Sequence, residues 1–213
     1  MSCYLFDFDG TLVDSMPTFG GMMLRILDEC GTEYPSNILK TITPLGFAGT
    51  ARYFIGMGVK KSEAELLSLM YKYAYEAYSN TIKAKPTVKE TLEKLKAMGH
   101  SLNVLTASPH SNLDVCLKRV GLYDLFDNVW SCDDFGTTKA NPEIYLSAAE
   151  KMGVPHSEVI FLDDNIDADR TAKSAGLKVI GVYDDSSSEY EDDFRTLCDG
   201  YIKEMRELLS ISI

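Results

Sequence analysis

The sequence predicts an α/β protein with a parallel sheet and an inserted block of helices. An apolar segment at residues 3–6 ends in acidic residues, and residues 15–80 show helical patterns without an obvious strand. From Pro86 onward, amphipathic helical patterns alternate with short apolar runs, which is typical of a parallel sheet with helices on both faces. The expected units are a Rossmann-like core of residues 1–14 and 83–213 and a helical insertion of residues 15–82.

Helices are expected throughout the insertion, and the last has the clearest pattern. The expected helices span residues 19–30, 36–41, 50–57 and 62–78. In the last of these, apolar residues recur at helical spacing. Ser62 is a favourable N-cap residue, and acidic residues follow it in the first turn. The insertion is therefore expected to be an all-helical domain.

The remainder of the chain supplies the alternating elements of the core. Strands are expected at residues 102–105, 128–130, 159–162 and 178–182, and helices at residues 87–98, 111–120, 142–152 and 167–175. The acidic stretch 184–193 is expected to be a solvated loop, because runs of charge usually face water. A metal site there is a less favoured alternative. The loop is expected to lead into a terminal helix at about residues 189–209.

Composition limits the classes of partner. With 213 residues and 45% hydrophobic content, the chain can form one domain and a smaller insertion. Its net charge of −11 disfavours a nucleic-acid partner but still allows one phosphate to be bound locally. The scattered cysteines lack zinc-site spacing. Because the first strand begins at residue 3 and no long apolar run follows, we expect a cytoplasmic protein without a membrane partner.

Two acidic residues directly follow the first strand, in the segment Asp7-Phe8-Asp9-Gly10-Thr11. Ligands of α/β sheets bind outside the carboxyl ends of the strands, so these carboxylates are expected in an active-site crevice. Two crowded carboxylates repel each other unless a cation or a proton is shared between them. Mg²⁺ is the expected cation, and an ordinary acidic turn is the alternative.

Three further segments place polar chemistry near strand ends. Thr106-Ala107-Ser108 supplies hydroxyl and backbone N–H groups that could bind a phosphoryl oxygen, although such a turn also suits a helix cap. Lys139 precedes an expected helix, where a cation opposes the helix dipole and indicates a bound anion; a surface lysine is the alternative. Asp163 and Asp164 form a second carboxylate pair, which suits Mg²⁺ better than a simple helix cap.

In this order, the four motifs resemble those of the haloacid dehalogenase superfamily of phosphohydrolases. The resemblance covers almost the whole chain, and Ala175-Gly176 follows Asp164 at the family's spacing. The chain departs from the family's pattern after Lys139, where Ala140 stands in place of the usual proline and Pro142 comes later. The helical insertion matches the family's first class of cap domain. The subfamily resemblance is to phosphoglycolate phosphatases and β-phosphoglucomutases.

The resemblance implies a role for each motif. Asp7 would attack phosphorus and form an aspartyl-phosphate, while Asp9 would serve as general acid and then as general base. Mg²⁺ would be held by the Asp7 carboxylate, the Asp9 backbone carbonyl and Asp164, with Asp163 as a further candidate ligand or as a partner of Lys139. The family's dehalogenases lack the second acid at the position of Asp9, so its presence favours phosphate chemistry.

The phosphate-binding residues implied by the resemblance are Thr106, Ala107, Ser108 and Lys139. In the cap, Gly46 and Arg52 are candidate substrate contacts, because Gly46 belongs to a loop shaped by glycine and proline and Arg52 could bind a carboxylate or hydroxyl. An ordinary surface arginine is an equal alternative for Arg52.

The expected function is a Mg²⁺-dependent phosphatase that hydrolyses a small phosphate ester, such as 2-phosphoglycolate or a sugar phosphate. A phosphosugar mutase of the β-phosphoglucomutase type is the closest alternative, and a non-catalytic binding protein on the same scaffold is a third. The intact set of Asp7, Asp9, Lys139 and Asp164 disfavours the binding protein. We expect a monomer or a weak homodimer.

Overall fold

The computed structural model describes residues 2–211, and the chain divides into two compact units. One unit comprises Met1–Asp14 and Lys83–Ile213, and the other comprises Ser15–Ile82. The segments that leave and rejoin the larger unit pair with each other. The Asp14 N–H donates to the Lys83 carbonyl at 2.9 Å, and the Lys85 N–H donates to the Leu12 carbonyl at 3.0 Å.

The larger unit is built on a six-stranded, all-parallel sheet, which confirms the expected fold class. In spatial order the strands are β3 (Asn128–Ser131), β2 (Ser101–Thr106), β1 (Cys3–Phe6), β4 (Val159–Asp163), β5 (Lys178–Val182) and β6 (Gly200–Ile202). Phe6 in β1 lies opposite Val104 on one side and Leu162 on the other. All of β1 and β4 is buried, as the central strands of a sheet covered on both faces should be.

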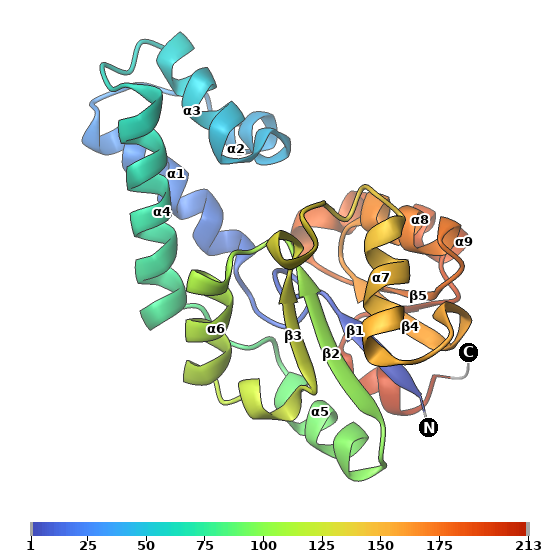
Figure 1. Cartoon of the computed structure of the whole chain (residues 1–213). Helices are drawn as coiled ribbons and strands as arrows, with labels where there is room; N and C mark the ends of the chain where they lie inside the picture. The colour runs from blue at the N-terminus through green and yellow to red at the C-terminus, as the bar shows by residue number, and fades with distance from the viewer. Residues whose placement is uncertain (1, 212–213) are drawn as a thin grey trace. The chain divides into compact units, whose positions relative to one another are not determined.

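Helices cover both faces of this sheet, as Figure 1 shows. They are α5 (Val88–Ala97), α6 (His110–Arg119), α7 (Glu143–Met152), α8 (Ile166–Ser174) and α9 (Glu191–Leu197). Short 3-10 helices lie at Tyr123–Leu125, Cys132–Phe135, His156–Glu158, Asp185–Tyr190 and Met205–Leu209. α7 and α8 share one buried apolar cluster with β1 and β4, where the Tyr145 ring packs edge-on against Phe161 at 5.1 Å.

The expected terminal helix over residues 189–209 is wrong. α9 ends at Leu197, and the chain then adds β6 to the edge of β5, with Gly200 opposite Ile180. Asp199 fixes this edge, because its N–H donates to the Val179 carbonyl and its side chain accepts from the Val179 N–H, both at 2.8 Å. Nothing local in the sequence shows that β5 has an edge available for a further strand, so the pattern of residues 200–202 does not distinguish a strand from a helix.

The smaller unit contains helices only. They are α1 (Met16–Glu29), α2 (Ile38–Ile42), α3 (Gly46–Gly56) and α4 (Glu63–Asn80), with a 3-10 helix at Thr43–Leu45. Ser62 and Glu65 form a reciprocal capping box that starts α4, since each side chain bonds to the other residue's backbone N–H. Within residues 2–211, no helix combines the length and the apolar character needed to cross a membrane.

Asp169, on α8, is an ionisable residue buried in the core of the larger unit. It is fully buried on α8, its Oδ2 accepts a bond from the Cys198 thiol at 3.3 Å, and its Oδ1 has no hydrogen-bond partner among the described residues. Burial, together with the charge of Asp163, raises the pKa of this carboxyl well above its usual value. A buried acceptor without a partner costs about 1–3 kcal/mol, so Asp169 destabilises the fold.

Asp169→Asn is expected to stabilise the protein by about 1 kcal/mol at pH 8, because the amide keeps the acceptor for Cys198 and cannot ionise. A carboxyl with a raised folded pKa costs stability as the pH rises above its unfolded pKa of about 3.9, so the gain should vanish near pH 4. Thermal denaturation at both pH values measures it. Asp167→Asn, at an exposed position of the same helix, is the matched control. Equal gains at both pH values would exclude ionisation as the cause.

Candidate active site

The carboxyl ends of β1, β2 and β4 bring three of the predicted motifs together. β1 lies between β2 and β4 in the sheet, and the Asp7 N–H extends the pairing by donating to the Leu162 carbonyl at 2.8 Å. Asp7 therefore stands next to Asp163, the last residue of β4, while Thr106 ends β2 on the other side. Parallel strands place their carboxyl ends at one edge, so segments distant in sequence become neighbours.

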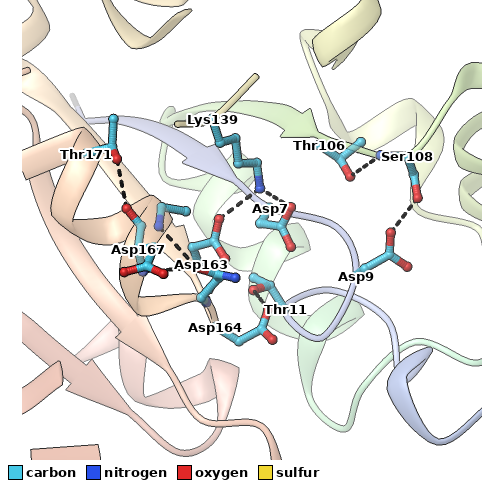
Figure 2. A network of polar contacts seen from close by, with 12 residues as sticks. Asp7, Asp9, Thr11, Thr106, Ser108, Lys139, Asp163, Asp164, Asp167 and Thr171 are labelled. Carbon is cyan, nitrogen blue, oxygen red and sulfur yellow. Dashed lines mark hydrogen bonds and ion pairs between the residues drawn. The ribbon is translucent and has the colours of Figure 1, made fainter. Parts of the chain in front are cut away.

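Lys139 connects two of these strand ends. Its Nζ donates to Asp7 Oδ1 and, at 2.8 Å, to Asp163 Oδ2 (Figure 2). Burial lowers the pKa of Lys139, but the charges of Asp163 and Asp7 outweigh this and raise it well above its usual value. Lys139 lies in the loop before α7, so these two carboxylates, and not the dipole of that helix, account for its position.

Asp7, Asp163 and Asp164 form a buried acid cluster. One carboxylate oxygen of each lies within 4.8 Å of the others. Burial raises the pKa of Asp7 to about 8, with Asp163 and Asp9 adding to the effect and Lys139 opposing it. Burial and the charges of Asp163 and Asp7 likewise raise the pKa of Asp164.

The donor set of this cluster fits a hard divalent cation. Its donors are carboxylate oxygens, the ligands that Mg²⁺ prefers in proteins. Lys139 offsets only part of the negative charge, and it engages Asp7 and Asp163. Asp164 Oδ1 accepts a bond from the Thr11 hydroxyl at 3.0 Å. Both oxygens of Asp163 accept bonds from the protein, Oδ2 from Lys139 and Oδ1 from the Asn165 N–H. Asp7 and Asp164 are therefore the residues that would hold Mg²⁺.

The turn from β4 into α8 fixes the Asp163 side chain. Asn165 is the N-cap of α8, and its side chain accepts from the N–H groups of Asp167 and Ala168 at 2.9 and 3.2 Å. The Asn165 N–H in turn donates to Asp163 Oδ1 at 2.8 Å. Local hydrogen bonds therefore set the direction of the Asp163 carboxylate before any ligand binds.

Asp9 lies outside the acid cluster. Its Oδ2 accepts a bond from the Ser108 hydroxyl at 2.5 Å, and the Ser108 N–H donates to Thr106 Oγ1 at 3.0 Å (Figure 2). The expected metal contact of Asp9 is through its backbone carbonyl, so this side-chain arrangement leaves that expectation untested. Ser108, expected to bind phosphate, is a partner of Asp9 here, and Ala107 lies exposed between Thr106 and Ser108.

The two candidate residues of the insertion lie in the smaller unit. Arg52, on α3, forms an ion pair with Glu63 at 3.0 Å, and its side chain is largely exposed. Gly46 begins α3 with a positive φ of 62°, a conformation that favours glycine. Their expected contact with a substrate remains a prediction.

Three polar residues near the cluster, Thr11, Lys85 and Asp184, were not predicted from the sequence. Thr11 belongs to the first motif, but no role was expected for its hydroxyl. Asp184 was expected to be solvated, yet its side chain is only 6% exposed and pairs with Lys85 at 3.1 Å. That expectation is wrong for Asp184, because no local pattern reveals a lysine that lies far away in the sequence.

Comparisons with known proteins show the family to which the chain belongs. Residues 4–182 match the family model described as haloacid dehalogenase-like hydrolase. Pyrophosphatase PpaX of Bacillus velezensis is 30% identical over 100% of this chain and 96% of its own length. A phosphoglycolate phosphatase of Psychrobacter arcticus is 26% identical over 93% and 95%. The structure of CbbY from Rhodobacter sphaeroides in complex with phosphate matches with a TM-score of 0.79 and 21% identity, covering 98% of this chain and 96% of that one. The chain therefore belongs to the haloacid dehalogenase-like hydrolase family, as its sequence motifs predicted.

Proposed function

We propose that this hydrolase is a Mg²⁺-dependent phosphatase that acts on a small phosphorylated metabolite through an aspartyl-phosphate. The observation that carries the proposal is the double ion pair of Lys139 with Asp7 and Asp163 inside the buried acid cluster. Relatives named as phosphatases, matched over most of this chain, support the same class of reaction. Their names make 2-phosphoglycolate and pyrophosphate the first substrates to test, beside sugar phosphates.

Asp7 is the proposed nucleophile. A carboxylate oxygen of Asp7 attacks phosphorus, a new O–P bond forms, and the bond from phosphorus to the leaving oxygen breaks. Lys139 favours the ionised form of Asp7 that this step needs, against the burial that raises its pKa. Mg²⁺ at Asp7 and Asp164 would supply positive charge to the phosphoryl oxygens.

Asp9 is the proposed acid and base. It donates a proton to the leaving oxygen, and it then accepts a proton from the water that hydrolyses the aspartyl-phosphate. The Ser108 hydroxyl, which donates to Asp9 Oδ2, holds this carboxyl in one orientation. Thr106, the backbone N–H groups of Ala107 and Ser108, and Lys139 are the proposed phosphate ligands.

The experiment that tests the proposal is phosphate release from a panel of compounds, measured with Mg²⁺ and with a chelator. The panel holds 2-phosphoglycolate, pyrophosphate, hexose 1- and 6-phosphates and nucleotides. We expect Mg²⁺-dependent release with a preference for one of the small compounds. Conversion of β-glucose 1-phosphate to the 6-phosphate with a bisphosphate primer, without phosphate release, would identify a mutase instead. If the protein showed neither phosphate release nor mutase activity with any compound, both the phosphatase and the mutase would be contradicted.

A further inference from the structure

Lys85 joins three segments of the larger unit around one ammonium group. Its Nζ donates to the Gly10 carbonyl at 2.6 Å, to the Tyr183 carbonyl at 2.7 Å and to Asp184 Oδ2 at 3.1 Å. An ammonium group has three N–H donors, so each of them has an acceptor. The Lys85 side chain is only 17% exposed. Lys85 therefore connects Gly10, in the motif that follows β1, to the residues that directly follow β5.

Asp184 is the ionic partner in this arrangement. Its Oδ1 accepts from the Ser186 N–H at 3.0 Å and from the Ser186 hydroxyl at 2.6 Å, while Oδ2 faces Lys85. The negative charge of Asp184 is close enough to the acid cluster to contribute to the raised pKa of Asp164. Lys85 and Asp184 thus form a partly buried pair without net charge beside that cluster.

Gly10 links this pair to Asp164. Gly10 has a φ of +78°, and a Cβ built on it would lie 2.3 Å from Asp164 Oδ2. The next residue, Thr11, donates its hydroxyl to Asp164 Oδ1 at 3.0 Å. Gly10 therefore leaves no room for a side chain beside Asp164 Oδ2, and the Thr11 hydroxyl binds Oδ1 of the same carboxylate. A shift of the Gly10 carbonyl that Lys85 binds would move these contacts.

We propose that Lys85 is a positioning residue that sets the metal affinity of Asp164 through Gly10 and Asp184. The inference rests on the metal dependence in the proposed function. If Lys85 acts by holding Gly10 and Asp184 in place, its removal should weaken Mg²⁺ binding. The charge of Lys85 alone would have the opposite effect, since removing a cation near an acid cluster should tighten the binding of another cation. The sign of the change therefore separates the two explanations.

The test is calorimetric titration of the protein with Mg²⁺ in the absence of substrate. The variants are Lys85→Met, the double variant Lys85→Met/Asp184→Asn, and Lys83→Met as a matched control at an exposed lysine of the same segment. We expect both Lys85 variants to bind Mg²⁺ about 10-fold to 100-fold more weakly, as for other residues that orient metal ligands. The control should match the wild type. At saturating Mg²⁺, the KM for substrate should change much less.

The double variant keeps the test decisive if Lys85→Met alone folds poorly. It removes both members of the partly buried pair, so neither is left as an unpaired charge. Any weakening of Mg²⁺ binding in this variant is then due to the lost positioning of Gly10 and Asp164. Unchanged or tighter binding in this variant would overturn the role of Lys85 while leaving the proposed function intact. A wild-type protein that does not bind Mg²⁺ would overturn both.

Discussion

Asp7→Asn is expected to lower phosphate release by at least about 10⁴-fold, the scale seen when a covalent nucleophile is removed. The amide has nearly the volume of the carboxylate but cannot attack phosphorus. Among residues 2–211, the neighbouring carboxylates have other hydrogen-bond partners: Asp163 is bonded to Lys139 and to the Asn165 N–H, Asp164 to Thr11, and Asp9 to Ser108. The measurement is kcat for the preferred substrate at saturating Mg²⁺.

Two controls test whether the loss of activity is due to the loss of the Asp7 nucleophile. Asp193→Asn removes an exposed acid on α9 and should leave kcat unchanged. Mass spectrometry of the wild type, quenched during turnover, should find a phosphoryl group on Asp7 and none in the Asp7→Asn variant. Because Lys139 retains Asp163 as a partner, the variant should still fold. Hydrolysis by Asp7→Asn at the wild-type rate would rule out Asp7 as the nucleophile.

Mg²⁺ is expected to stabilise the protein, and more strongly as the pH rises. Burial raises the pKa of Asp7 to about 8 and also raises the pKa of Asp164, whereas an unfolded aspartate has a pKa of about 3.9. Between these values the folded protein without metal binds more protons than the unfolded chain, so its stability falls as the pH increases. A bound cation needs the ionised carboxylates and offsets their repulsion, so its effect increases over the same range.

Thermal denaturation at pH 5, 7 and 9, in Mg²⁺ and in chelator, measures this effect. At roughly a hundredfold excess over the dissociation constant, binding is worth about 2.7 kcal/mol, which corresponds to a rise in Tm of about 5–10 °C for a chain of this size. Asp164→Asn should raise the Tm in chelator at pH 9, because one buried charge is removed, and should abolish most of the Mg²⁺ effect. A full Mg²⁺ effect in that variant would show that the ion binds elsewhere.

Much of the fold and of the candidate site followed from the sequence. The candidate site residues Asp7, Lys139 and Asp163 lie in short local motifs near strand ends, so the sequence alone predicts them. The structure adds contacts that no local pattern encodes. Lys85 reaches Gly10 and Asp184 across long stretches of chain, and β6 forms because β5 has a free edge.

The pairing of the two connecting segments has a consequence for how this architecture can vary. Residues 12–14 and 83–85 run antiparallel and share hydrogen bonds, so the inserted unit begins and ends at adjacent points of the larger one. The entropic cost of closing a loop increases only slowly with the length of the loop. Changes in the size or sequence of the insertion should therefore have little effect on the sheet and its strand register. Such an arrangement allows the helical unit to diversify, or to be exchanged for another, while the residues at the strand ends stay in place.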